Sequence, residues 1–217
     1  MRPMDAEPRP LLRGVFHLYA FYAALAAGVV LVVLSDSTRE RLAAWIYAAA
    51  LVAMFGGSAL YHRVRWRSAV VRAWIRRLDH STIFLFIAGT YTPFALLAFH
   101  GTIGTVLLVV AWAGAALGLV LNLAWIDAPA WLAACAYVTL GWAGIVALPY
   151  LFGDVGVAGG VLLIVGGALY TLGAAAYALR WPDPAPTVFG FHEVFHVLVV
   201  AAAIVQYVAV SLVVLPA

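Results

Sequence analysis

The chain has 217 residues, of which 66% are hydrophobic and only 10% are charged, whereas soluble domains are about half apolar and about a quarter charged. This composition excludes a soluble globular protein, because too few polar side chains remain to cover a surface in water. The basic residues are all Arg, and their placement between apolar runs fits anionic lipid headgroups and not nucleic acid. The single Cys135 excludes an internal disulfide.

Seven apolar runs, each about long enough to cross a bilayer, follow one another along the chain. They cover residues 14–34, 42–61, 80–99, 103–125, 130–152, 157–179 and 188–215. These runs leave no room for a sizeable soluble domain. We therefore expect an all-α fold, a bundle of seven transmembrane helices spanning 14–217, after an N-terminal tail of residues 1–13.

The positions of the arginines orient this bundle. With a cytoplasmic N-terminus, the cytoplasmic segments hold Arg2, Arg9, Arg13, Arg63, Arg65, Arg67, Arg72, Arg76, Arg77 and Arg180. The outer segments then hold only Arg39 and Arg41. Because cytoplasmic loops carry an excess of basic residues, we expect the N-terminus inside and the C-terminus outside. The segment 63–78 carries most of the cytoplasmic arginines together with Trp66 and Trp74. This composition is typical of a cytoplasmic interfacial segment.

Ionisable groups within the apolar runs are costly and usually functional. His192 and His196 lie four residues apart near the start of the seventh run, so on a helix both imidazoles share one face, about 6 Å apart along the axis. His62 closes the second run, and the expected topology puts it at the same depth. Three imidazoles from two helices are typical of an open zinc site, in which water takes the fourth position.

Two further polar residues accompany these histidines. Asp79 lies at the start of the third run, and Ser58 lies one helical turn before His62. Asp79 would hydrogen-bond the zinc-bound water or take its proton, and Ser58 would bind the same water or a substrate carbonyl. HEVFH also matches the HExxH zincin pattern, in which the Glu is the general base. Glu193 is therefore either such a base or a carboxylate that the start of a helix favours.

Each candidate also has a simpler alternative. His192 and His196 would be polar side chains at a membrane interface, and His62 would be another. Asp79 would pair with a neighbouring arginine, and Ser58 would ease close helix packing. His17, near the inner end of the first run, is expected to lie beside the site, whereas His80 and His100 are given no role.

The segments GSALYHR, RLDHSTIFLFIAGTYTPF and HEVFH together resemble the signature blocks of the hemolysin III family. That family is the bacterial branch of the progestin and adipoQ receptor group, which includes the adiponectin receptors, and its wider superfamily includes alkaline ceramidases. The resemblance implies zinc held by His62, His192 and His196, with Asp79 and Ser58 around its water. Together with the arginine positions, it implies a multi-pass protein of the bacterial inner membrane with the metal site near the cytoplasmic face.

Two classes of function stay open. The first is a zinc-dependent hydrolase whose substrate is a lipid amide or ester taken from the bilayer; the resemblance to ceramidases suggests the amide. The second is non-enzymatic, with a structural zinc ion in a membrane-homeostasis protein or a pore-forming, cytolytic one. A protease of the soluble zincin type is a weaker third option. In each case membrane lipids are the expected partners.

Overall fold

The computed structural model describes residues 10–125 and 127–215, so Arg2, Arg9 and most of the expected N-terminal tail lie outside the described residues. The protein is 83% helical, and the described residues form no strand. Seven helices are long and apolar enough to cross a membrane, as the sequence predicts. They are α1 (Val15–Val33), α2 (Thr38–Arg63), α3 (Ala69–Pro93) with its π-helical extension (Phe94–Ala98), α4 (Thr102–Ala124), α5 (Ala130–Gly141) with a following 3₁₀ turn (Ala143–Ala147), α7 (Gly156–Leu179) and α8 (Phe191–Val214).

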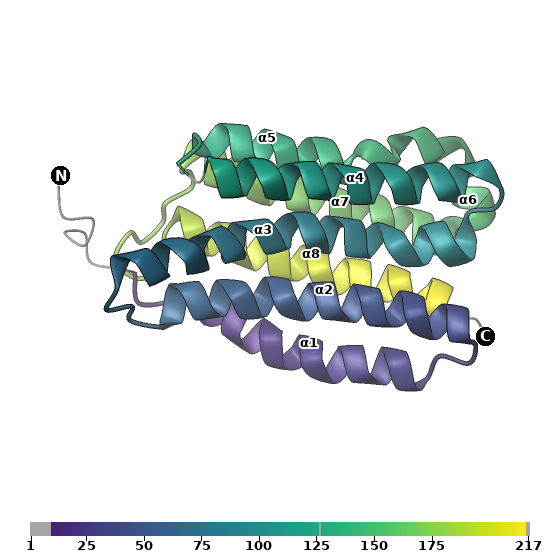
Figure 1. Cartoon of the computed structure of the whole chain (residues 1–217), viewed down its shortest axis with the longest axis horizontal. Helices are drawn as coiled ribbons and strands as arrows, with labels where there is room; N and C mark the ends of the chain where they lie inside the picture. The colour runs from purple at the N-terminus through teal and green to yellow at the C-terminus, as the bar shows by residue number, and fades with distance from the viewer. Residues whose placement is uncertain (1–9, 126, 216–217) are drawn as a thin grey trace.

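The long helices run alongside one another and close into a bundle (Figure 1). Each of α1 to α4 packs on the next, α5 packs on α7, α7 packs on α8, and α8 returns to contact α1. The second and third helices are the most enclosed, with 56% and 61% of their most apolar windows buried. At Gly89 of α3 an added Cβ would lie 2.6 Å from Ala50 Cβ of α2, so glycine permits the close approach of these two helices.

The second and third helices begin earlier than the apolar runs suggest. Ser37 and Glu40 form a capping box that starts α2 at Thr38, and the Ser68 hydroxyl accepts from the Val71 amide to start α3 at Ala69. Residues 69–78 of the basic segment are therefore the first turns of the third spanning helix. The expected starts of these two helices were too late because they followed hydrophobicity alone. N-caps stabilise helix starts among polar residues as well.

The expected fifth span, residues 130–152, is not one continuous helix. It breaks after Gly141, passes through the 3₁₀ turn and resumes as the short α6 (Leu148–Asp154). The Tyr91 hydroxyl of α3 lies at this break, where it donates to the Gly141 carbonyl at 2.6 Å and accepts from the Gly144 amide at 2.8 Å. Lipid offers no replacement for lost backbone hydrogen bonds, so this hydroxyl stabilises the irregular backbone.

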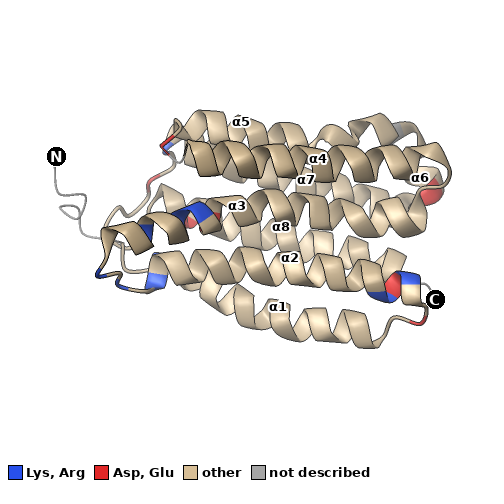
Figure 2. Ribbon diagram, in the orientation of Figure 1, with Lys and Arg blue, Asp and Glu red and all other residues tan. Residues whose placement is uncertain are grey.

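Charged residues lie mostly at the ends of the bundle (Figure 2). The end where α1, α3 and α8 begin and α2 ends is here called the site end. The described arginines at the site end are Arg13, Arg63, Arg65, Arg67, Arg72, Arg76, Arg77 and Arg180, and those at the opposite end are Arg39 and Arg41. Because the number of spans is odd, α1 begins and α8 ends at opposite ends of the bundle (Figure 1).

Replacing Tyr91 with Phe tests whether its hydroxyl stabilises the break in the fifth span. The change keeps the ring but leaves a carbonyl and an amide of the break without partners, so we expect Tyr91→Phe to destabilise the protein by about 1–3 kcal/mol. Reversible unfolding of the purified protein in detergent measures this difference. Tyr19→Phe is the matched control, because Tyr19 is 71% exposed. Equal stability of the two variants would contradict the assigned role of the hydroxyl.

Candidate metal centre

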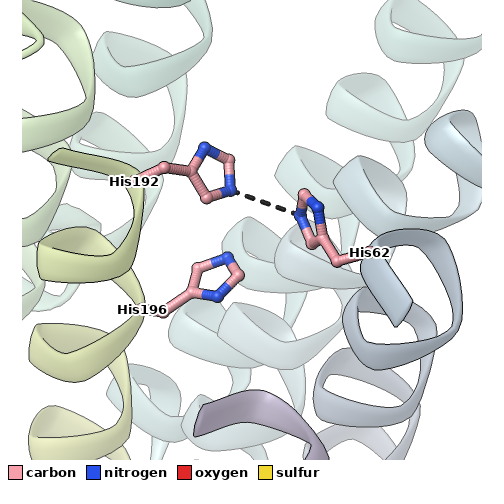
Figure 3. A group of neighbouring side chains, drawn as sticks. All are labelled: His62, His192 and His196. Atoms are coloured by element: carbon pink, nitrogen blue, oxygen red, sulfur yellow. Dashed lines mark hydrogen bonds between the residues drawn. The ribbon is translucent and has the colours of Figure 1, made fainter. Parts of the chain in front are cut away.

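Three histidine side chains meet at the site end, one from the last turn of α2 and two from the first turns of α8 (Figure 3). Among the described His, Cys, Asp and Glu residues, His62, His192 and His196 form a group whose ligand atoms all lie within 4.8 Å of one another. The Nε2 atoms of His62 and His192 face each other at 3.2 Å. The sequence thus predicts correctly which three histidines come together.

The spacing of these nitrogens fits a metal ion. Two nitrogens bound to one tetrahedral zinc at about 2.0–2.1 Å lie about 3.3 Å apart, close to the separation of His62 and His192. The Nδ1 atom of His196 is buried without a hydrogen-bond partner among the described residues. A buried imidazole nitrogen without a partner is destabilising, and a bound cation would compensate for it. The donor set therefore fits zinc, although three imidazoles also suit neighbouring transition metals.

The second helix presents His62 with little freedom to move. Its side chain is 7% exposed, and Gly14, which precedes α1, packs directly against it. An added Cβ at Gly14 would lie 2.5 Å from the His62 Cβ, and the backbone there has a φ of +75°, which favours glycine. No sequence motif marks Gly14, because the contact joins residues that are far apart in the chain.

The start of α8 is fixed by two carboxylates. Glu193 is fully buried; one of its oxygens accepts from Arg13, and the other accepts from the Gly190 amide at 2.9 Å. Asp183 accepts from the Phe191 amide, also at 2.9 Å. Both Glu193 oxygens are thus engaged: one caps the start of α8 itself, and the other joins it to Arg13 in the segment before α1. This geometry favours the helix-start alternative for Glu193 over the zincin base.

Asp79 and Ser58 lie beside the histidines, as their sequence positions suggest. Asp79 is 8% exposed and its Oδ2 lies 3.6 Å from His62 Nε2. Ser58 is 3% exposed and adjoins the Asp79 carboxyl group. Asp79 falls outside the group of mutually close ligand atoms, so its carboxylate adjoins the three histidines without completing a four-residue cage.

The neighbouring arginines have partners of their own. Arg76 forms an ion pair with Asp127 at 2.9 Å, and Arg77 donates to the Leu123 carbonyl at 3.4 Å. Arg76 also acts electrostatically on the Asp79 carboxyl group, so Asp79 adjoins both this arginine and His62.

A fourth imidazole belongs to the same cluster. His17 of α1 is 3% exposed and stacks on His196, with ring centroids 3.8 Å apart and planes within 10°. It also forms an edge-type contact with Phe55, with ring centroids 5.1 Å apart. The depth of His17 in the first run correctly suggests proximity, but the stacking depends on how α1 and α8 pack. His100 is exposed in the loop at the opposite end.

A cavity of about 240 Å³ extends from the histidines into the bundle. His192, His196, Asp79 and Ser58 line one end, and most of the remaining lining residues are apolar or aromatic. His80, given no role from the sequence, also lines this space. The polar cluster therefore lies at one end of an elongated apolar chamber and is not a closed site between helices.

Comparison with known proteins agrees with this architecture. The family described as Haemolysin-III related matches residues 6–207. The Hemolysin-3 homolog of Bacillus subtilis (strain 168) is 32% identical over 120 residues, which are 55% of each chain. Hemolysin-3 of Bacillus cereus is 31% identical over 127 residues, 55% of this chain and 57% of that protein.

A human protein shares a shorter region. The monocyte to macrophage differentiation factor of Homo sapiens is 32% identical over 80 residues, 36% of this chain and 34% of its own length. The chain spans little more than half the length of the bacterial relatives it matches. The family match, in contrast, covers nearly the whole sequence and includes every histidine of the candidate centre. This chain belongs to the haemolysin-III-related family of multi-pass membrane proteins.

Proposed function

We propose that this chain is a zinc-dependent hydrolase that acts on a lipid amide or ester taken from the bilayer. One observation carries the proposal: three close imidazoles and a buried acid lie at one end of an apolar cavity. Hydrolysis of a lipid needs a polar reaction centre adjoining space for a hydrocarbon chain, and this arrangement supplies both.

The roles of the side chains follow from their positions. When bound by the three histidines, zinc would polarise a carbonyl group and activate a water molecule for attack near neutral pH. Asp79 adjoins His62 and would accept a proton from the attacking water, then deliver it to the leaving group. Ser58 adjoins Asp79 and would orient that carboxyl group by a hydrogen bond.

The cavity also reaches the outer surface of the bundle. Trp142 and Ile145, at the break after α5, line the cavity and are exposed. The Trp142 indole donates to Thr171 of α7 at 2.8 Å, which links the two elements beside the opening. In a membrane this surface faces hydrocarbon, so a lipid would enter sideways from the bilayer. The amide is preferred over the ester only by resemblance to the ceramidases.

The non-enzymatic alternative has less support. The Bacillus cereus relative is named Hemolysin-3, which suggests cytolysis, but a water-filled pore needs a polar lining and this cavity is mainly apolar. A structural zinc site normally has four protein ligands, whereas the described group contains three histidines with Asp79 outside it. Both features favour a reaction centre over a structural ion.

We also propose that the site end faces the cytoplasm and that the protein resides in a bacterial inner membrane. The excess of arginines at the site end supports this orientation. A centre in this position would release its polar product into the cytoplasm, while the acyl chain of the substrate points towards the middle of the bilayer.

Metal analysis of the purified protein tests the ligand set. We expect about one zinc per chain in the wild type, and loss of most of it in His192→Ala, because an open site has only three protein ligands. His100→Ala is the matched control, since His100 is exposed at the opposite end. Elemental analysis after mild chelation measures the content. Retention of full zinc occupancy by the His62, His192 and His196 alanine variants would contradict the assignment.

A lipid panel tests hydrolysis. Asp79→Asn keeps the shape of the side chain but removes its basicity, so we expect kcat to fall by about 10²–10⁴-fold with zinc still bound. Release of fatty acid from amide-linked and ester-linked lipids is the measurement. Asp154→Asn, an exposed carboxylate near the opposite end, is the control. If the zinc-loaded wild type and Asp79→Asn release no fatty acid from any lipid, the hydrolase proposal fails for those classes.

Cysteine labelling tests the orientation. In a Cys135→Ser background, Arg67→Cys lies at the site end and Thr102→Cys at the opposite end, and both positions are exposed. We expect a membrane-impermeant maleimide to label Thr102→Cys in intact spheroplasts and Arg67→Cys only after the membrane is opened. The reverse pattern would place the site end outside.

A further inference from the structure

The far stretch of the cavity holds two polar groups that the metal centre does not explain. Gln206 of α8 and Tyr170 of α7 both line the cavity. Gln206 Oε1 and the Tyr170 hydroxyl are buried and have no hydrogen-bond partner among the described residues. Gln206 follows His196 by ten residues on α8, which corresponds to roughly 15 Å along the helix. These groups therefore lie too deep to contact a metal ion held by the histidines.

The bundle is packed around the Gln206 side chain. Gln206 is 5% exposed and is the single Gln of the chain. Its Nε2 donates to the Leu163 carbonyl of α7 at 3.4 Å, and an added Cβ at Gly166 would lie 2.6 Å from the same atom. Glycine at position 166 thus leaves room for the amide group. The contact with Leu163 anchors the nitrogen and leaves the oxygen as a free acceptor.

Tyr170 lies one helical turn from Gly166, on the same face of α7. Its ring packs edge-on against Phe86 with centroids 6.1 Å apart, which holds the hydroxyl at the cavity. A tyrosine hydroxyl can donate as well as accept. The free acceptor of Gln206 and the free donor of Tyr170 are therefore about one turn apart along the cavity, on facing helices.

Such groups destabilise the protein if nothing hydrogen-bonds to them. A buried polar atom without a partner costs about 1–3 kcal/mol, and lipid supplies no water at this depth. Polar side chains inside spans are commonly functional for this reason. A ligand hydroxyl would satisfy both groups, because it donates to an amide oxygen and accepts from a phenol.

We propose that Gln206 and Tyr170 form a second polar subsite, which recognises a hydroxyl group carried partway along the hydrocarbon chain of the bound lipid. The inference rests on the proposed function insofar as a lipid occupies the cavity. It narrows the substrate class to lipids with a hydroxylated chain, whose polar head lies at the histidines and whose second polar group lies deep in the membrane.

Oleic and ricinoleic acid are suitable probes, because both have an unsaturated chain and they differ by one hydroxyl in its middle. Competition with a fluorescent fatty acid on the zinc-loaded full chain measures their affinities. We expect the wild type to bind ricinoleate about tenfold more tightly, the effect of one hydrogen bond to a buried group. Gln206→Met and Tyr170→Phe keep side-chain volume and should each reduce this preference several-fold while preserving oleate affinity.

Thr90→Val is the matched control, because Thr90 lines the cavity but its hydroxyl already donates to the Phe86 carbonyl. We expect Thr90→Val to keep the full preference. Equal affinities for the two acids in the wild type, a preference that persists in both Gln206→Met and Tyr170→Phe, or binding of neither acid would overturn the subsite. A protein that hydrolyses no lipid yet prefers ricinoleate would overturn the proposed function and leave the subsite standing.

Discussion

The absence of hydrogen-bonding partners in lipid is the constraint on which this structure depends. Every polar group within a span must find its partner inside the protein, and most do so here. Tyr91 hydrogen-bonds to the broken backbone of the fifth span, and Asn122 donates to Ser81 and to the Arg77 carbonyl. Where described groups lack partners, as at His196 and Gln206, the same constraint identifies the places where a metal ion or a ligand would bind.

The candidate metal centre combines two helices that lie far apart in the sequence. Contacts between α1 and α8 close the bundle, so His62 of the second helix comes within 3.2 Å of His192 of the last. Arg13 and Glu193 join the segment before α1 to the start of α8, while Gly14 packs against His62. The segment just before α1 thus helps to position the histidines, although it supplies none of the three.

The sequence predicts much of this arrangement for identifiable reasons. Apolar runs reveal seven spans because lipid requires them, and alternating span direction brings His62, Asp79 and the α8 histidines to one end. The starts of α2 and α3 were predicted too late, because capping side chains and not apolar residues begin them. The break at Gly141 and the stacking of His17 on His196 depend on contacts between distant residues. No local pattern encodes such contacts.

The odd number of spans has a consequence for gene duplication and for engineering. Since α1 starts and α8 ends on opposite sides of the bundle, a second copy joined directly after Leu215 would enter the membrane upside down. Its arginines would then oppose the orientation that they favour in the first copy. Tandem arrays of this bundle therefore need an additional spanning helix as a linker, whereas two separate chains can associate side by side in the same orientation.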